Sequence, residues 1–270
     1  MKKIVVIKIG GTLIKQVNLL ESLVMALKQL IDQGMQLVVV HGGGPQADAL
    51  SKKLGISINK ISGKRITNKE TLSIVKMVFK GSLNTDLVAI CEKLGIPAVG
   101  ISGVDGKIAE VIKKPLINDI DFGFVGEIKK INSDLINILL KKNYLPVITC
   151  LGIDDDGQVF NINADTLTTE IALKLNADKL IFITDVEGVS ENKNNKYLKK
   201  LSINKAEKMI RKGTITGGMI PKIENIKNAI VGGINKILVV GGLQDQSKWI
   251  GAIKNNSYGT IIVPNYKFIK

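Results

Sequence analysis

The sequence predicts an α/β fold in which a mainly parallel sheet carries helices on both faces. Short apolar runs recur along the chain, and segments with apolar residues at helical spacing stand between them. Several of these runs end directly in glycines, as at a tight turn from a strand into a helix. Strands that alternate with helices form a parallel sheet, because each crossover brings the chain back to the same end of the sheet.

The composition fits a globular chain with a large core. It has 270 residues, 45% of them apolar, and a mean hydropathy of +0.19, enough for one large domain or two modest lobes. No apolar run approaches membrane-spanning length, and the amino terminus lacks the pattern of a signal peptide, so we expect a cytoplasmic protein. Cys91 and Cys150 stand in apolar surroundings, where buried free thiols are expected.

In the first half, apolar runs and helical periodicity define the expected elements. Strands are expected at 4–9, 37–40, 98–101 and 145–150, and helices at 17–33, from the glycines to about 54, at 69–94 with an interruption near Gly81, and at 133–142. Residues 56–66 alternate apolar and polar around Ser62-Gly63, which predicts a hairpin with Lys64-Arg65 at or just beyond its tip.

Two glycine turns are the main functional signal. The run 37–40 continues into His41-Gly42-Gly43-Gly44-Pro45, and the run 4–9 carries Lys8 and ends in Gly10-Gly11. Successive glycine N–H groups at a helix start can surround an anion, and proline suits the first helical position. One such turn can be purely structural. Two of them with a lysine between indicate a phosphate site.

The second half continues the pattern. Asp154-Asp155-Asp156-Gly157 predicts a hairpin turn, because the spacing of a calcium loop is absent. Strands are expected at 180–185, 237–240 and 260–263, the last at a sheet edge, with helices at 166–175, 203–212, 219–231 and around Trp249. Residues 191–200 are polar enough for a loop. A lobe boundary is expected near 150–180.

The charge of the chain is strongly positive. A net charge of +14 and a pI near 9.6 suit a nucleic-acid binder, but the lysines are scattered and aromatic residues make up only 4%. We therefore expect a basic surface and no nucleic acid or membrane partner. Only two of the 38 basic residues are arginines, Arg65 and Arg211, and a planar guanidinium can bind a carboxylate through two hydrogen bonds.

Six motifs, in order and spacing, together resemble the amino acid kinase family, most closely its members that phosphorylate N-acetyl-L-glutamate. They are Lys8-Ile9-Gly10-Gly11, His41-Gly42-Gly43-Gly44, Gly63-Lys64-Arg65-Ile66-Thr67, Asn161-Ile162-Asn163-Ala164-Asp165, Thr184-Asp185-Val186-Glu187-Gly188-Val189 and Gly218-Met219-Ile220-Pro221-Lys222. The resemblance implies an open three-layer αβα sandwich with two lobes. Residues 1–175 would bind the acylamino acid and form a homodimer, and residues 176–270 would bind ATP.

The resemblance also assigns roles to residues. Lys8 and Lys222 would contact the transferring phosphoryl group, and Asp165 would hold both lysines. Gly43 and Gly44 would donate N–H groups to the substrate, Arg65 would bind its α-carboxylate, and Asn161 would bind the same end. The ATP side would comprise Gly10, Gly11, Asp185, Val186, Glu187, Gly188, Val189, Thr214, Ile215, Thr216 and Met219. Mg²⁺ would be held mainly by the phosphates, without a set of protein ligands. His41, which no acid or nucleophile motif accompanies, is expected to be structural.

Taken alone, several of these residues have plainer interpretations. Lys222 suits a solvated lysine at a helix start, Asp165 a favourable charge at a helix amino terminus, and Arg65 a surface arginine.

The implied reaction moves the γ-phosphoryl group of ATP onto the side-chain carboxylate of an N-acylated glutamate, in the second step of arginine biosynthesis. The motifs leave acetyl or succinyl open as the acyl group. A kinase for carrier-protein-linked aminoadipate or glutamate is a rival, although the longer arginine-rich segment of such enzymes is missing near Arg65. A non-catalytic nucleotide or nucleic-acid binder is another, but it would not need Lys8, Asp165 and Lys222.

Regulation can also be anticipated from the resemblance. Family members inhibited by arginine carry an extra helix ahead of the first strand, which links their dimers into rings. Here the first strand is expected by Ile4. We therefore expect a homodimer that arginine does not inhibit.

Overall fold

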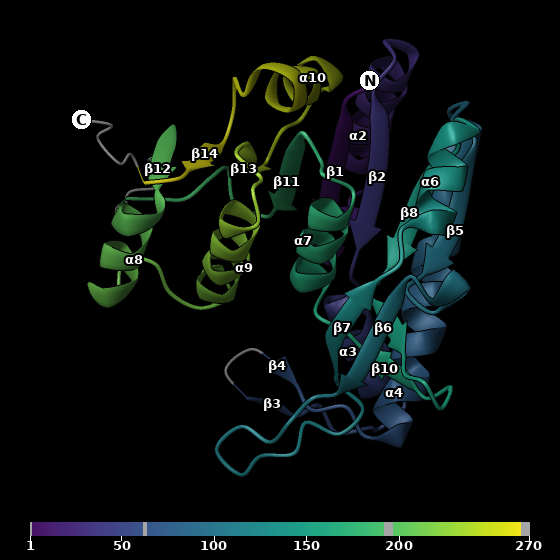
Figure 1. Ribbon diagram of the computed structural model, residues 1–270. Helices are drawn as coiled ribbons and strands as arrows, with labels where there is room; N and C mark the ends of the chain where they lie inside the picture. Colours follow the sequence, from purple (N-terminus) through teal and green to yellow (C-terminus); the bar gives the residue numbers. More distant parts are fainter. Residues whose placement is uncertain (1, 62–63, 192–196, 266–270) are drawn as a thin grey trace.

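The computed structural model describes residues 2–61, 64–191 and 197–265, and its centre is one eight-stranded sheet (Figure 1). The strand order is β12-β14-β13-β11-β1-β2-β8-β5. Neighbouring strands run parallel except β13 and β14. The strands of this sheet are β1 (Ile4–Ile9), β2 (Gln36–His41), β5 (Ala98–Ser102), β8 (Leu145–Thr149), β11 (Lys179–Thr184), β12 (Lys200–Ser202), β13 (Ile237–Gly241) and β14 (Thr260–Val263).

Two smaller sheets extend from the carboxyl edge of the amino-terminal half. One contains β6 (Ala109–Lys113), β7 (Gly126–Ile131), β9 (Leu151–Ile153) and β10 (Val159–Asn161), and the other pairs β3 (Lys60–Ile61) with β4 (Lys64–Arg65). The expected turn at Ser62-Gly63 lies outside the described residues. The acidic turn at 154–157 joins β9 to β10, as predicted.

Helices connect the strands. They are α1 (Gly11–Ile14), α2 (Val17–Asp32), α3 (Gly44–Lys53), α4 (Lys69–Lys76), the π-helix η1 (Met77–Leu83), α5 (Asn84–Lys93), the 3₁₀ turn η2 (Asp105–Lys107), α6 (Asp134–Lys141), α7 (Ala164–Lys174), α8 (Ile203–Arg211), α9 (Met219–Val231) and α10 (Gln246–Asn255).

Side chains of β11 point alternately to the two faces of the sheet, and their contacts show that helices cover both faces. Lys179 donates from one face to the backbone of α10, while the Phe182 ring lies on the other face, 5.1 Å from the Lys222 ammonium of α9. Helices α7, α8 and α9 pack together (Figure 1). On the other face, α2 packs against both α5 and α10. The predicted α/β fold with helices on both faces is confirmed.

The central strands are apolar along nearly their whole length. Val5, Val6 and Ile7 of β1, and Leu180 and Ile181 of β11, are at most 1% exposed. Strands covered by helices on both faces need continuous apolar sequence, since both sides of the strand are in the core. Cys91 and Cys150 are buried free thiols, as expected, and burial raises the pKa of each to about 12.

Two expectations about elements need correction. Thr260–Val263 was expected at the sheet edge, but β14 lies between β13 and β12, and β12 is the outermost strand. The three residues of β12 fall at the end of a polar segment, so no apolar run marks them. The interruption expected near Gly81 is a π-helix that continues α4 directly into α5.

His41 is structural, as expected. Its side chain is buried at the end of β2, where Nδ1 lies 3.1 Å from Gly42 O and Nε2 accepts from Asn84 Nδ2 at 2.9 Å. Burial lowers the pKa of His41 to about 4, so its ring is neutral at neutral pH. In the described chain, no helix is long and apolar enough to cross a membrane.

Candidate active site

The carboxyl edge of the central sheet collects the groups that the sequence singled out. Ligands of open parallel sheets bind outside this edge, because the loops and helix amino termini that can hold them lie there. Lys8 is near the end of β1, Asp165 is in the first turn of α7, and Lys222 is in the first turns of α9.

These three residues form one ion-paired cluster. Lys8 Nζ lies 3.1 Å from Asp165 Oδ1, and Lys222 Nζ lies 2.7 Å from Asp165 Oδ2. The side chains of Lys8 and Asp165 are each 15% exposed, and that of Lys222 is 8% exposed. The cluster therefore has a formal net charge of +1 at a position with little exposure to water, where an anion is held more strongly than in bulk water.

Burial and charge act in opposite directions on Asp165 and Lys222. Burial would raise the pKa of the Asp165 carboxyl, but Lys8 and Lys222 outweigh burial, and the pKa lies below its ordinary value. Burial lowers the pKa of Lys222, and Asp165 counteracts that effect. The Phe182 ring beneath Lys222 adds a cation–π contact, which holds the ammonium without removing its charge.

Two glycine turns lie beside this cluster. Gly43 precedes α3 and lies against η1, where an added Cβ would collide with Leu83 and Phe79. A side chain at Gly43 would therefore push the turn out of position. Gln46 Nε2 donates to Gly11 O at 2.7 Å and so ties the turn after β2 to the turn after β1.

The amino terminus of α3 provides unpaired N–H groups at this point. Gly43 caps the helix without a side-chain hydrogen bond, and Pro45 occupies the first turn. A Cβ on Gly44 would meet no heavy atom within 4 Å beyond its chain neighbours and the backbone of its own helix. The backbone amides of this turn can thus approach an anionic ligand closely.

Asn161 contacts the segment that carries Arg65. Asn161 Nδ2 donates to Thr67 Oγ1 at 3.2 Å, and Thr67 stands two residues after Arg65. The Arg65 side chain is 8% exposed, and its Nη2 lies 2.6 Å from Asp48 Oδ1 and donates to Gly44 O at 3.2 Å.

One end of the Arg65 guanidinium remains without a partner among the described residues. Its Nη1 is buried and makes no hydrogen bond there. A buried unpaired donor is costly, and a carboxylate on a ligand would satisfy it. Asp48 was missed by sequence reasoning, because an acid in the second turn of a helix is ordinary.

A pocket of about 500 Å³ lies at the carboxyl end of β11. It is lined by Asp185, Val186, Glu187, Gly188, Val189, Ser190, Tyr197, Thr214, Ile215, Thr216 and Met219. All nine residues expected on the nucleotide side after β11 are in this lining, while the expected Gly10 and Gly11 are not. Met219 stands one helical turn before Lys222, so the pocket adjoins the charged cluster.

Ser190 and Tyr197 belong to the same pocket and were missed. Ser190 continues the Asp185–Val189 segment, and Tyr197 pairs with it across an isolated β-bridge. Tyr197 follows a polar stretch in the sequence, so only its aromatic character could have marked it.

The described acidic residues near the pocket do not gather into a metal site. Within residues 2–61, 64–191 and 197–265, no three His, Cys, Asp or Glu side chains lie close enough together to hold a metal ion. Asp185 and Glu187 line the pocket without forming such a cluster.

The fold is a mainly parallel sheet between two layers of helices. Together with glycine turns at the carboxyl ends of the strands and two lysines paired with one carboxylate, it is characteristic of an α/β phosphotransferase. The model of the amino acid kinase family matches residues 3–241, and the chain belongs to this family.

Individual relatives agree over nearly the whole chain. An acetylglutamate kinase of Brachyspira hyodysenteriae is 37% identical, with 96% of this chain and 90% of that protein covered. One from Methanocorpusculum labreanum is 39% identical, with 97% and 91% covered. The crystal structure of smu.665 from Streptococcus mutans UA159 is 32% identical, covers 97% of this chain and 99% of its own, and superposes with a TM-score of 0.82.

Proposed function

We propose that this protein is an acetylglutamate kinase, which transfers the γ-phosphoryl group of ATP to the side-chain carboxylate of N-acetyl-L-glutamate and so makes N-acetyl-L-glutamyl 5-phosphate in arginine biosynthesis. The observation that carries the proposal is the cluster of Lys8, Asp165 and Lys222 beside a nucleotide-sized pocket. The similarity to the acetylglutamate kinases named above supports the choice of acceptor.

The chemistry needs positioned positive charge and no general base. A side-chain carboxylate has a pKa of about 4 and is already ionised at neutral pH. The barrier comes from bringing this anion to the triphosphate and from the charge on the transferring phosphoryl group. Lys8 and Lys222 can neutralise that charge, and Asp165 fixes both ammonium groups through its two oxygens.

The substrate is then held at its other end. Arg65 Nη1 would bind the α-carboxylate, since it is the donor left unpaired, and Asn161 would hydrogen-bond the same end. Gly43 and Gly44 would donate backbone N–H groups to the substrate, and Gly10 and Gly11 would do so to the phosphates.

The remaining residues complete the nucleotide side. The pocket lined by Asp185–Val189, Thr214–Thr216 and Met219 would hold the nucleotide. Mg²⁺ bound mainly by the phosphates would supply further neutralisation of their charge.

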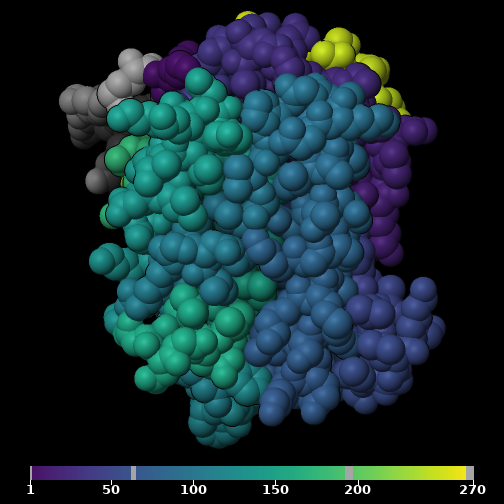
Figure 2. All heavy atoms as spheres, turned by 90° about the vertical axis from the view of Figure 1, so that its right-hand side faces the viewer, coloured from purple at the N-terminus to yellow at the C-terminus, as the bar shows by residue number. Residues whose placement is uncertain are grey.

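The finer organisation is also part of the proposal. Residues 1–175 would bind the acylamino acid and residues 176–270 the ATP, within one continuous sheet. The protein would be a cytoplasmic homodimer. Exposed apolar side chains such as Met77 and Ile138 lie on α4–η1–α5 and α6, which cover much of the face in Figure 2, and they suit a second copy.

A hydroxylamine-trapping assay tests the acceptor. Purified protein with ATP and Mg²⁺ is offered N-acetyl-L-glutamate, N-succinyl-L-glutamate, N-acetyl-L-aspartate and L-2-aminoadipate in parallel. We expect hydroxamate from N-acetyl-L-glutamate at the highest kcat/KM. If no N-acylglutamate gives a hydroxamate, the proposal is overturned. If N-succinyl-L-glutamate turns over faster than N-acetyl-L-glutamate, the acyl group of the substrate is succinyl and not acetyl.

A further inference from the structure

A second cavity, of about 480 Å³, lies at the opposite edge of the central sheet from the candidate active site. It is formed where β1, β11 and β13 begin and where α2 and α10 end, near the point marked N in Figure 1. Five of its twelve lining residues are lysines, Lys2, Lys3, Lys179, Lys236 and Lys254, and the single acid is Asp178. The chain as a whole has 38 basic residues in 270, so this lining is strongly enriched in positive charge.

The sheet brings three of these lysines together. Lys3 precedes β1, Lys179 begins β11, and Lys236 precedes β13. These strands are direct neighbours and run parallel. Lys236 stands level with Lys179 on the neighbouring strand, about 5 Å away, and Lys3 lies two residues before Val5, the residue level with Lys179 on the other side. Lysines on three neighbouring strands therefore share one edge.

The one acid in the lining, Asp178, already accepts a backbone hydrogen bond, and the lysines have no acidic partner among the described residues. Asp178 Oδ2 accepts from the Ile4 N–H at 2.8 Å. In the described part of the chain, none of the five lysines forms a salt bridge, and Lys3 and Lys236 make no side-chain hydrogen bond.

Two of the lysines have a structural role that explains their presence. Lys179 is 6% exposed and donates to Ala252 O at 3.1 Å and Ile253 O at 2.5 Å. Lys254 Nζ donates to Gln33 Oε1 at 2.9 Å. Cations at a helix carboxyl terminus are stabilising, so the end of α10 accounts for these two. The end of α10 does not account for Lys3 and Lys236. Neither forms a side-chain hydrogen bond or salt bridge in the described part of the chain, and their positive charges repel those of the other lysines.

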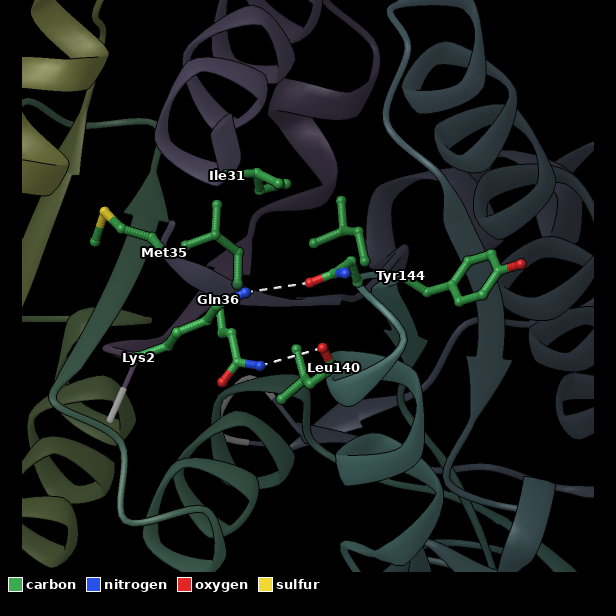
Figure 3. A pocket seen from close by; sticks show the side chains of 9 residues that line it. Lys2, Ile31, Met35, Gln36, Leu140 and Tyr144 are labelled. Carbon is green, nitrogen blue, oxygen red and sulfur yellow. Dashed lines mark hydrogen bonds between the residues drawn. The ribbon is translucent and has the colours of Figure 1, made fainter. Parts of the chain in front are cut away.

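Lys2 is not part of the same set. Its Nζ donates to Asn143 Oδ1 at 3.3 Å. Lys2 lines a small adjoining pocket together with Gln36, Leu140 and Tyr144 (Figure 3). The ligand-facing candidates are therefore Lys3, Lys179 and Lys236, with Lys254 at the rim.

The crowding of positive charge affects the pKa of the buried Lys179. Burial, together with the charge of Lys236, lowers the pKa of Lys179 to about 8. An anion in the cavity would offset both effects, because it would replace lost hydration and separate the two cations.

We propose that this cavity is a second binding site, which takes a small anion with two or more negative charges, of the phosphate-ester or polycarboxylate class. The volume falls within the range of small-molecule sites. Lys3 and Lys8 stand at opposite ends of β1, about 17 Å apart at the rise of a strand, so the site is separate from the candidate active site.

Amide NMR spectra of the full-length protein test the site at about 150 mM NaCl, where exposed charges are screened beyond about 8 Å. Pyrophosphate and citrate are titrated separately, which distinguishes the phosphate from the carboxylate source. We expect saturable shifts of Gly34 and Asn256 with at least one probe. The amides of Gly43 and Gly44 report any binding at the candidate active site.

Matched double variants decide between a site and general charge. Lys3→Gln with Lys236→Gln should weaken binding at Gly34 and Asn256 at least 10-fold. Lys113→Gln with Lys227→Gln removes the same charge from exposed ion pairs elsewhere and should change it less than 2-fold. Equal weakening in the two double variants, shifts confined to Gly43 and Gly44, or no shifts with either probe would overturn the proposal.

Discussion

Lys222 donates to Asp165 at 2.7 Å although 57 residues separate them in the chain. The other oxygen of the same carboxylate faces Lys8, so β1, α7 and α9 meet at a single acidic side chain. Asp165 thus organises the candidate active site, and substitutions of its two lysine partners test the mechanism most directly.

Lys8→Ala and Lys222→Ala should each lower kcat by about 100-fold or more, because each removes a charge that acts mainly on the transition state. Steady-state kinetics with N-acetyl-L-glutamate and ATP measure this effect. Lys227→Ala, which removes an exposed lysine from the same helix as Lys222, is the control and should keep full activity. Wild-type turnover in a folded Lys8 or Lys222 variant would contradict the mechanism.

Asp165→Asn should destabilise the fold by about 3–5 kcal/mol, because Lys222 would remain buried without its counter-charge. Urea unfolding monitored by circular dichroism gives this free energy. Adding Lys222→Met to Asp165→Asn should restore much of the stability without restoring activity. If the second substitution restores no stability, the cost does not come from the unpaired lysine.

Arg65→Lys should raise KM for N-acetyl-L-glutamate and leave KM for ATP nearly unchanged, since lysine keeps the charge but loses the planar fork. Initial rates with each substrate varied in turn separate the two constants. A change confined to the ATP constant would mean that Arg65 faces the nucleotide instead.

His41 should make the fold less stable as pH falls from about 6.5 to about 4. The folded pKa is lowered to about 4, so over this range the unfolded chain binds a proton that the native protein does not. The loss should total about 3 kcal/mol at pH 4 and should vanish above pH 6.5. Denaturant titrations at several pH values measure it, with His41→Asn expected to show a shallower slope.

The same group can be observed directly. The chain has one histidine, so its imidazole resonances are unambiguous. They should stay those of the neutral ring down to about pH 5 in the folded protein. Titration near 6.5 would show that the ring is not held neutral by burial.

Much of the fold followed from pattern because the central strands are apolar along nearly their whole length, and β1 and β2 lead directly into glycines. Short or polar elements gave no such signal. The three residues of β12 look like loop, and their pairing with β14 depends on contacts between distant segments. The π-helix η1 keeps the chain helical but shifts the 3.6-residue period between α4 and α5, and periodicity alone cannot distinguish such a shift from a break at Gly81.

The residues of the candidate site that belong to sequence motifs could be predicted, and those outside the motifs could not. Lys8, Asp165 and Lys222 are far apart in sequence, but the motifs that contain them resemble those of one family, which predicts that the three lie together, as they do in the structure. Asp48, Ser190 and Tyr197 were not foreseen. Their roles depend on which side chain lies opposite them, as Asp48 lies opposite Arg65, and a single sequence holds no record of that.

The position of β1 in the middle of the sheet has a consequence during synthesis. β1 is made first, yet its neighbour β11 begins only at Lys179, so one edge of the central strand stays unpaired while the intervening chain is translated. At 5–20 residues per second this lasts roughly 10–35 s. An exposed apolar strand edge can pair with other chains, so the nascent protein is open to aggregation until β11 reaches its place beside β1.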